Sequence, residues 1–285
     1  MFATWSAWAD WAWYYVLIAL FLGLSLWEAV RPAREPGLPV AGRWATNLGL
    51  HAASAIVLTV VLPSALADAL VRAAGLDWHP LKHVAEALGD WPALLGGILL
   101  FDLYAYGMHR IQHTVFPLWR LHAVHHADTE MDASTTLRHH PLEVLVSSGI
   151  GVVLFALIGL PEWIAPIYAL IGITVSMVQH VNAGRPGRVD QALQAVLVTP
   201  GMHQVHHSAD ARDHDSNYGT VFSIWDRMFG TYRATPARGR AAMTYGIEGF
   251  TDPSWAAPRW GLLLPLRIRR ERAADTLPLP VQAAE

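Results

Sequence analysis

Histidine is the residue whose number and spacing in this sequence could support chemistry. The chain of 285 residues contains 15 histidines, and the pattern H-x-x-H-H occurs twice. Positions three or four residues apart on a helix share one face, so each cluster would project its imidazoles in one direction. Eight converging imidazoles are too many for one metal ion and predict a site for two. The clustered residues are His109, His113, His122, His125, His126, His203, His206 and His207.

The residue types around these histidines narrow the metal and the reaction. The sequence has no cysteine, which excludes thiolate metal sites, cysteine-ligated iron–sulfur clusters and disulfides. A zinc protease would place a general-base glutamate after the first histidine, whereas Arg110 follows His109 here. Zinc sites usually take three or four ligands, so a large imidazole set favours iron, whose redox change suits O2 activation.

The elements that must position the histidines are strongly apolar. Hydrophobic residues make up 53% of the chain and charged residues 15%, against about 25% charged residues in a soluble domain. Apolar runs at about residues 11–30, 46–71 and 91–108 come close to or exceed the ~20 residues that a membrane helix needs. Because no Lys or Arg precedes the first run, we expect a retained helix rather than a secretory signal.

Two further apolar stretches, at about residues 142–160 and 163–178, are separated only by Pro161 and Glu162. So short a break predicts a tight helical hairpin that dips into the bilayer and returns. From His180 onward the chain is polar and aromatic, up to an apolar patch at residues 260–266. Basic residues follow that patch, so we expect it to lie at the membrane interface.

Together these runs predict an all-α fold, because lipid-exposed backbone must satisfy its own hydrogen bonds. The predicted architecture is an integral membrane helical bundle of about three spanning helices plus the hairpin, with a cytosolic histidine-rich cap. We expect an N-terminal membrane helix and basic loop over residues 1–45 and a catalytic domain over residues 46–231. A C-terminal interfacial tail would cover residues 232–285.

The distribution of positive charge predicts the orientation. Of the 20 Lys and Arg residues, 15 follow Met108 and three lie in the loop after the first helix. Three crossings put both regions on one side, and the positive-inside rule makes that side cytoplasmic. The histidines would therefore face the cytoplasm from a cell membrane. No basic stripe with interleaved aromatic residues is present, so we expect no nucleic-acid partner.

Several sequence motifs, in order, resemble the fatty acid hydroxylase and sterol desaturase superfamily of membrane di-iron enzymes. The resemblance runs from about the second membrane helix to Thr231, roughly two thirds of the chain. The matching pieces are D-L-Y-A-Y-G-M-H-R-I-Q-H at residues 102–113, L-H-A-V-H-H at 121–126, R-H-H-P-L-E at 138–143, Q-H-V-N at 179–182, T-P-G-M-H-Q-V-H-H at 199–207 and N-Y-G-T-V-F-S-I-W-D-R-M-F-G-T at 217–231.

The resemblance implies that the eight clustered histidines are metal ligands, together with His180. His140 would be a ligand or would lie behind one, whereas His139 is expected to point away and His214 to face solvent. The implied cofactors are two iron ions with O2 as co-substrate. Because the chain has no dinucleotide motif and no cysteine for an iron–sulfur centre, electrons would come from a separate ferredoxin or cytochrome with its reductase.

Two polar residues inside the third apolar run are candidates for supporting the site. Asp102 lies seven residues, about two helical turns, before His109, and Tyr106 lies between them on the same stripe. An acid inside a membrane helix is energetically unfavourable and is usually functional, so we expect Asp102 to orient a ligating imidazole. Glu143 would either pair with Arg138 or face a ligand. Asn217, Asp226 and Arg227 are expected to secure the cap.

The function that this pattern favours is O2-dependent hydroxylation, or desaturation, at a C–H bond of a membrane lipid such as a sterol or fatty acyl chain. One alternative is a zinc-dependent membrane lipid hydrolase, which would turn over without O2 or reductant. Another is a metal transporter, which would need polar residues threaded through several apolar helices. The superfamily also includes an ether-cleaving branch, and ligand spacing does not separate these reactions.

Overall fold

The computed structural model describes residues 7–62, 80–184, 186–250 and 252–269. Within these ranges the regular structure is helical, and β contacts are confined to isolated bridges such as Pro32 with Ala183. The predicted all-α class is therefore confirmed.

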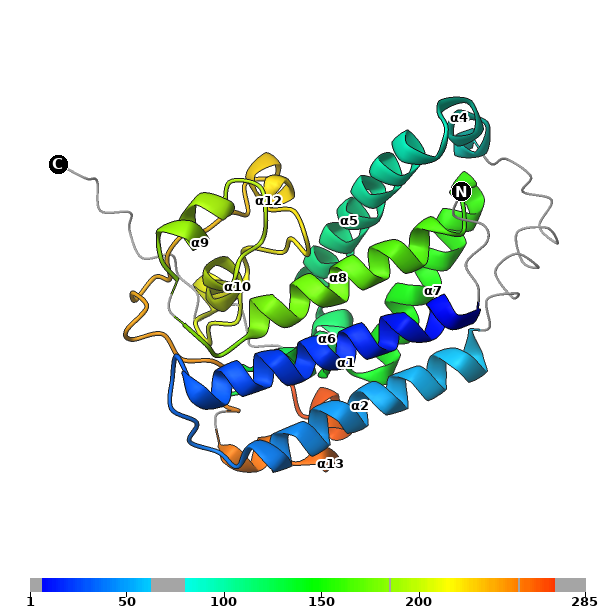
Figure 1. Ribbon diagram of the computed structural model, residues 1–285. Coiled ribbons are helices and arrows are strands. Elements are labelled where there is room, and N and C mark those ends of the chain that lie inside the picture. The colour runs from blue at the N-terminus through cyan, green and yellow to red at the C-terminus, as the bar shows by residue number, and fades with distance from the viewer. Residues whose placement is uncertain (1–6, 63–79, 185, 251, 270–285) are drawn as a thin grey trace.

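Five long helices form the body of the molecule (Figure 1): α1 (Ala7–Val30), α2 (Val40–Val61), α5 (Asp90–Thr114), α7 (Pro141–Ile158) and α8 (Ile164–His180). Of these, α1, α2, α5 and α7 are long and apolar enough to cross a membrane, and α8 is a shorter apolar helix. The predicted second run extends beyond α2 to residue 71, and its last part lies outside the described residues. The membrane bundle predicted from the apolar runs is confirmed.

The predicted hairpin consists of α7 and α8. Gly159 ends α7 with a φ of 71°, a left-handed conformation that glycine adopts without a Cβ clash. Pro161 follows and cannot continue the helix. The hairpin turn lies at the end of the bundle where α4 (Pro80–Leu88) and the start of α5 are also found (Figure 1).

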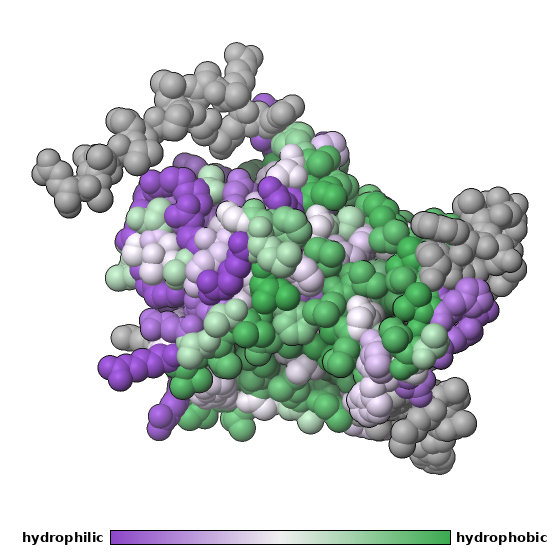
Figure 2. All heavy atoms as spheres, turned by 90° about the horizontal axis from the view of Figure 1, so that it is seen from above, coloured by the Kyte–Doolittle hydropathy of each residue, from purple (hydrophilic) through white to green (hydrophobic). Residues whose placement is uncertain are grey.

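Apolar side chains cover the outside of the bundle, as the green surface in Figure 2 shows. Leu26, Ile56, Val60 and Leu95 are each more than 60% exposed. A soluble monomer rarely exposes so continuous an apolar surface, whereas a bilayer would cover it. These helices therefore embed the chain in a membrane.

A polar cap lies at the other end of the bundle. It contains the short helices α9 (Arg188–Leu193), α10 (Pro200–His206), α11 (Ala211–His214) and α12 (Ile224–Met228). Figure 1 shows α9, α10 and α12 gathered beside the ends of α8 and α5. Two further elements, α6 (Phe116–His126) and the 3-10 helix η2 (Ala133–Leu137), connect α5 to α7. The cap and α6 supply most of the clustered histidines.

The C-terminal segment packs onto the bundle. The elements η3 (Pro253–Ala256), α13 (Pro258–Leu263) and η4 (Leu264–Leu266) follow the cap. Leu264 is fully buried in a core cluster with Leu50 and Val124, whereas Leu266 is 71% exposed. Earlier in the segment, Met243 and Tyr245 pack with Met131. Met243, Tyr245 and Leu264 thus join this segment to the core, and the exposed Leu266 is a candidate for interfacial contact. Arg270 and Arg272 lie outside the described residues.

Candidate metal centre

Four separate parts of the chain bring histidines to the junction between bundle and cap. The last two turns of α5 carry His109 and His113, and the last two turns of α6 carry three more. His180 is the final residue of α8, and the second H-x-x-H-H pattern lies on α10 and the residue after it. Nine of the ten histidines nominated as ligands therefore meet in space, and His140 is the exception.

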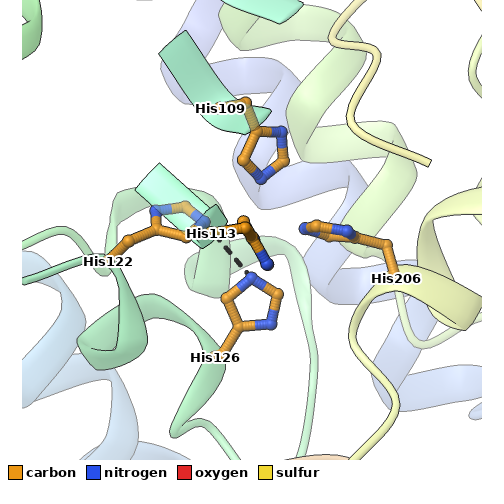
Figure 3. A group of neighbouring side chains, drawn as sticks. All are labelled: His109, His113, His122, His126 and His206. Atoms are coloured by element: carbon orange, nitrogen blue, oxygen red, sulfur yellow. Dashed lines mark hydrogen bonds between the residues drawn. The ribbon is translucent and has the colours of Figure 1, made fainter. Parts of the chain in front are cut away.

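These nine residues form two groups in which the ligand nitrogens lie within 4.8 Å of one another. The first group, drawn in Figure 3, points its rings toward a common centre. The second group lies beside it. The first group consists of His109, His113, His122, His126 and His206, and the second of His125, His180, His203 and His207.

Each H-x-x-H-H pattern is divided between the two groups, so the expectation that a cluster projects in one direction is wrong. His122 and His126 join the first group and His125 joins the second. Adjacent residues on an α-helix point about 100° apart, whereas residues four apart nearly coincide. His122 and His126, and likewise His203 and His207, are four residues apart and share a group, whereas the adjacent pairs His125–His126 and His206–His207 are separated.

Backbone carbonyls fix the tautomers of several of these imidazoles. The Nδ1 atoms of His109 and His206 lie 2.9 and 2.7 Å from the carbonyl oxygens of Tyr218 and Ser216. His180 Nδ1 lies 2.7 Å from the carbonyl oxygen of Ser176. Since a carbonyl only accepts, each Nδ1 carries the proton and Nε2 of the neutral ring keeps its lone pair.

The remaining nitrogens face one another. His180 Nε2 lies 3.0 Å from Nε2 of His203, 3.1 Å from that of His207 and 3.3 Å from that of His125. His180 has no proton on this nitrogen, and three neighbouring rings converge on it. A cation placed among these four Nε2 atoms would be bound by all of them when each ring carries its proton on Nδ1, as in metal sites built from imidazoles.

The electrostatic environment keeps the imidazoles neutral, which is the form that binds metal. Burial, and then repulsion from neighbouring imidazoles, lowers the pKa of His125, His126, His203, His206 and His207 well below the ordinary value.

Among the described residues, several buried imidazole nitrogens have no hydrogen-bond partner: Nε2 of His109, His113 and His206, and Nδ1 of His125, His126 and His203. Buried nitrogens of this kind normally find a partner, so the donor set fits bound metal ions.

Glu143 contacts the histidines and not Arg138, which resolves the choice that the sequence left open. Its Oε1 atom accepts hydrogen bonds from Nδ1 of His122 at 2.7 Å and of His139 at 3.0 Å. Arg138 instead donates to the carbonyl oxygen of Val124. A carboxylate on the outer nitrogen of an imidazole holds that ring in position and strengthens it as a ligand.

The expectations for His139 and His140 are reversed in the structure. His139 does not point away: its ring stacks on His125 with centroids 4.5 Å apart, and it forms a third possible metal-binding group with His122 and Glu143. His140 instead caps the start of α7, where Nδ1 accepts from the backbone N–H of Leu142 and Nε2 lies 3.3 Å from the carbonyl oxygen of Leu262. The extended backbone of His140 before Pro141 separates the directions of the two side chains.

Asp102 does not orient an imidazole, so that expectation is wrong. The carboxylate of Asp102 accepts from the backbone N–H groups of Val221 and Phe222, from Trp225 Nε1 and from the hydroxyl of Tyr168. The Tyr106 hydroxyl lies 2.9 Å from Thr231 Oγ1. Both residues attach the cap to α5, because their stripe faces residues 218–231 rather than the histidines.

The residues expected to secure the cap do so. Asp226 accepts from the backbone N–H groups of Tyr218 and Gly219, and Asn217 donates to the carbonyl oxygens of Met202 and Arg233. Arg227 donates to the carbonyl oxygen of Gln194. The cap loop is therefore fixed over the histidines at many points.

His214 does not simply face solvent. Its side chain is only 15% exposed and stacks on Trp119, with ring centroids 5.2 Å apart. Trp119 also contacts His113 and His126 of the first group. His214 thus belongs to the aromatic layer around the first group without joining it.

A long cavity adjoins the two groups. Its volume is about 1100 Å³, and it is lined by α5, α7 and α8. His109, His122, His125, His180 and His203 form part of its wall, and Leu160 and Pro161 at the hairpin turn also line it. The cavity therefore runs from the histidines into the membrane bundle.

A family model described as fatty acid hydroxylase matches residues 94–231, a span that includes all the histidines of both groups. An ornithine lipid hydroxylase from Rhizobium tropici is 30% identical over 230 residues, which cover 77% of this chain and 65% of that protein. A human alkylglycerol monooxygenase is 30% identical over 52% of this chain and 32% of its own length. A cholesterol 25-hydroxylase-like protein from Danio rerio is 29% identical over 54% of this chain and 62% of its own length.

The chain thus spans less than two thirds of the length of these three relatives. No solved structure matches it. The motifs, the two histidine groups and the relatives nevertheless agree: the chain belongs to the fatty acid hydroxylase superfamily.

Proposed function

We propose that this protein is a di-iron oxygenase that hydroxylates a C–H bond of a membrane lipid. The observation that carries the proposal is the direct contact between two buried histidine groups and a cavity that enters the membrane bundle. The names of the relatives, an ornithine lipid hydroxylase and an alkylglycerol monooxygenase, support a lipid substrate and a hydroxylation.

Iron is the metal that best suits the donor set. The first group supplies five imidazoles, more than the three or four ligands usual at zinc, and the second group supplies four. Zinc has no redox chemistry, whereas paired irons bound in these groups would activate O2 for attack on an unreactive C–H bond.

The protein's own residues hold and shield this chemistry. Glu143 fixes the ring of His122, and backbone carbonyls fix His109, His180 and His206, so the lone pairs converge before any ligand arrives. The cavity wall next to them includes Met108 and Val144, which offer apolar contacts to a lipid substrate beside the polar groups at this end. Asp102 and Asp226 close the cap over the groups.

Electrons would come from a separate ferredoxin or cytochrome with its reductase. In keeping with the charge distribution of the sequence, we propose that the cap and the histidines face the cytoplasm, where such a donor can dock.

Metal content of the detergent-purified protein, loaded with ferrous iron without oxygen, tests the metal site. We expect about two irons per chain, and about one after His113→Ala or His203→Ala, because each change removes a ligand from only one group. His83→Ala is the matched control, since the His83 side chain is 86% exposed on α4. Full iron content in both ligand variants would contradict the proposed site.

Activity is tested with isotopically labelled O2, a reductant and a lipid extract. Incorporation of one labelled oxygen atom into a lipid would support the hydroxylase. Release of a fatty acid or alcohol without O2 or reductant would instead support the zinc-dependent lipid hydrolase.

A further inference from the structure

The long cavity has a polar end and an apolar end. At the histidine end, its wall includes Gln112, Glu143, Ser147, Ser176 and Gln179 in addition to the imidazoles. Toward the hairpin turn the lining changes to Phe101, Val152, Phe155, Ala156, Leu160, Ala165 and Ala169. The cavity therefore matches an amphiphile that lies with its polar part next to the metal centre.

Lining residues on three helices extend along this cavity. On α7 the lining residues recur every three or four positions, from Val144 to Ala156, over about 18 Å of helix. On α8 they run from Ala165 to Gln179, over about 21 Å. The space is thus elongated along the bundle, which suits an extended chain.

The polar side chains in the apolar half either form hydrogen bonds within the protein or lie at the end of the cavity farthest from the histidines. The Tyr168 hydroxyl donates to Asp102, and the Tyr104 hydroxyl donates to the carbonyl oxygen of Ser147. Both tyrosines therefore offer mainly their rings to the cavity, where Tyr168 stacks on Phe101 and Tyr104 packs edge-on against Phe155. Glu162 is exposed at the hairpin turn itself.

The helices that form the apolar half approach each other closely. A side chain at Gly97 would lie 2.8 Å from Ile164, so α5 and α8 touch there because Gly97 has none. Gly151 likewise leaves room for the ring of Tyr104, which lies 3.1 Å from where a Cβ would be. These contacts hold α5 close to α8 and α7 in the apolar half of the bundle.

From this polarity and shape we propose that the substrate is a chain lipid bound with its headgroup beside the histidines and its tail extending toward the hairpin turn. The oxidised carbon would then lie within a few bonds of the headgroup, and Val152, Phe155 and Leu160 would limit the chain length. The reaction itself rests on the proposed function, whereas the orientation of the lipid does not.

Photoactivatable palmitic acids test the orientation without turnover. One probe carries a diazirine at the methyl end and the other carries it beside the carboxyl group. After irradiation of the purified protein without O2 or reductant, labelled peptides are identified by mass spectrometry. We expect the methyl-end probe to label residues 152–169 and the carboxyl-end probe to label residues 108–112 and 143–148.

Val152→Trp and Val153→Trp form a matched pair of variants. Both valines are 36% exposed, but only Val152 lines the cavity. Val152→Trp should reduce labelling by the palmitic acid probes about tenfold and leave labelling by an octanoic acid probe, whereas Val153→Trp should change neither. The proposal is overturned if the methyl-end probe labels the histidine end, if labelling is insensitive to Val152→Trp, or if no cavity residue is labelled. Any of these results can occur with an active hydroxylase, and correct labelling can occur without one.

Discussion

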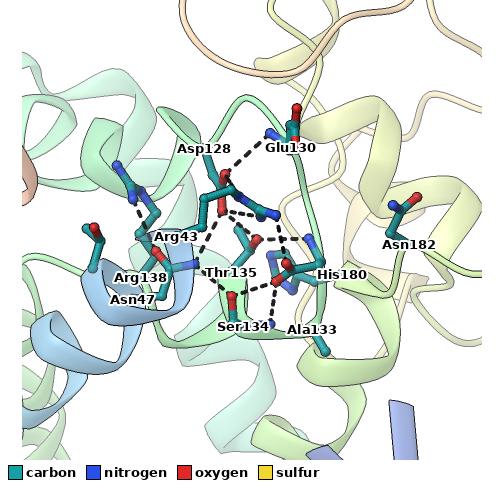
Figure 4. A network of polar contacts seen from close by, with 12 residues as sticks. Arg43, Asn47, Asp128, Glu130, Ala133, Ser134, Thr135, Arg138, His180 and Asn182 are labelled. Carbon is teal, nitrogen blue, oxygen red and sulfur yellow. Dashed lines mark hydrogen bonds and ion pairs between the residues drawn. The ribbon is translucent and has the colours of Figure 1, made fainter. Parts of the chain in front are cut away.

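Arg43 and Asp128 form a buried, two-pronged ion pair that joins membrane helix α2 to the loop after α6. Arg43 Nε and Nη2 each lie 3.0 Å from one carboxylate oxygen of Asp128, and Nη1 lies 2.7 Å from Asp132. Asn47, one turn further along α2, donates to Ser134 in the same network (Figure 4). Because Asp128 follows His126 by two residues, this network sets the position of the histidines at the end of α6.

Arg43→Ala should therefore destabilise the protein by about 3 kcal/mol, since it leaves Asp128 and Asp132 buried without their cation. The measurement is the fraction of protein that remains monodisperse in detergent after heating. Arg31→Ala, at an exposed arginine between α1 and α2, serves as the control and should have little effect. Equal heat resistance in the two variants would show that the buried network contributes no stability.

Glu143→Gln should weaken metal binding by about 10- to 100-fold, because a neutral amide holds the His122 ring less firmly and makes it a poorer ligand. The measurement is the metal retained against increasing concentrations of a chelator. Glu162→Gln changes an exposed glutamate at the hairpin turn and should leave retention unchanged. A Glu143→Gln protein that holds metal like the parent would mean that the carboxylate has no part in the site.

Asp102→Ala should loosen the cap. The change leaves the N–H groups of Val221 and Phe222 and the Trp225 indole without their acceptor, at about 1–3 kcal/mol for each buried group. Limited proteolysis should then cut within residues 217–231 while the membrane helices stay intact. Tyr168→Phe removes only one donor to Asp102 and should have a smaller effect. An uncut cap in the Asp102→Ala protein would argue against this anchoring role.

His140→Ala should leave the metal content unchanged, because both ring nitrogens of His140 face the backbone of other residues. Loss of its cap on α7 should lower stability by about 1 kcal/mol. His126→Ala, in contrast, removes a member of the first group and should reduce the metal content. Metal loss in His140→Ala comparable to that in His126→Ala would restore His140 as a ligand.

The metal-free protein should lose stability in mild acid. Burial and neighbouring imidazoles lower the pKa of His125, His126, His203, His206 and His207 in the folded state, whereas in the unfolded chain each titrates near its ordinary value of about 6.5. The unfolded chain therefore binds more protons below this pH. As the pH is lowered below about 6.5, the free energy of unfolding should therefore fall by up to about 1.4 kcal/mol per pH unit for each of these histidines. Urea unfolding of the metal-free protein across this range is the measurement, and a midpoint independent of pH would contradict it.

The sequence by itself determined the apolar helices and the histidines. Membrane helices can be predicted from the length of apolar runs, which is read directly from the sequence. The helices α1, α5, α7 and α8 lie close to the predicted runs. The eight clustered histidines and His180 were likewise identifiable from their spacing and motifs, because metal sites at helix ends use local patterns. The interfacial tail remains a prediction, and the burial of Leu264 against α2 and α6 was not predictable because it depends on contacts far along the chain.

Only the tertiary structure decided how the polar residues are paired. Each H-x-x-H-H pattern is divided between two groups because adjacent helical positions diverge, and the partners that complete each group come from α5, α8 and α10. His139 joins the site, His140 caps α7 and Asp102 anchors the cap, although all three lie in motifs shared with the superfamily. A buried polar group pairs with whichever partner folding brings within hydrogen-bond distance. The spacing of residues along the sequence does not determine which groups come that close.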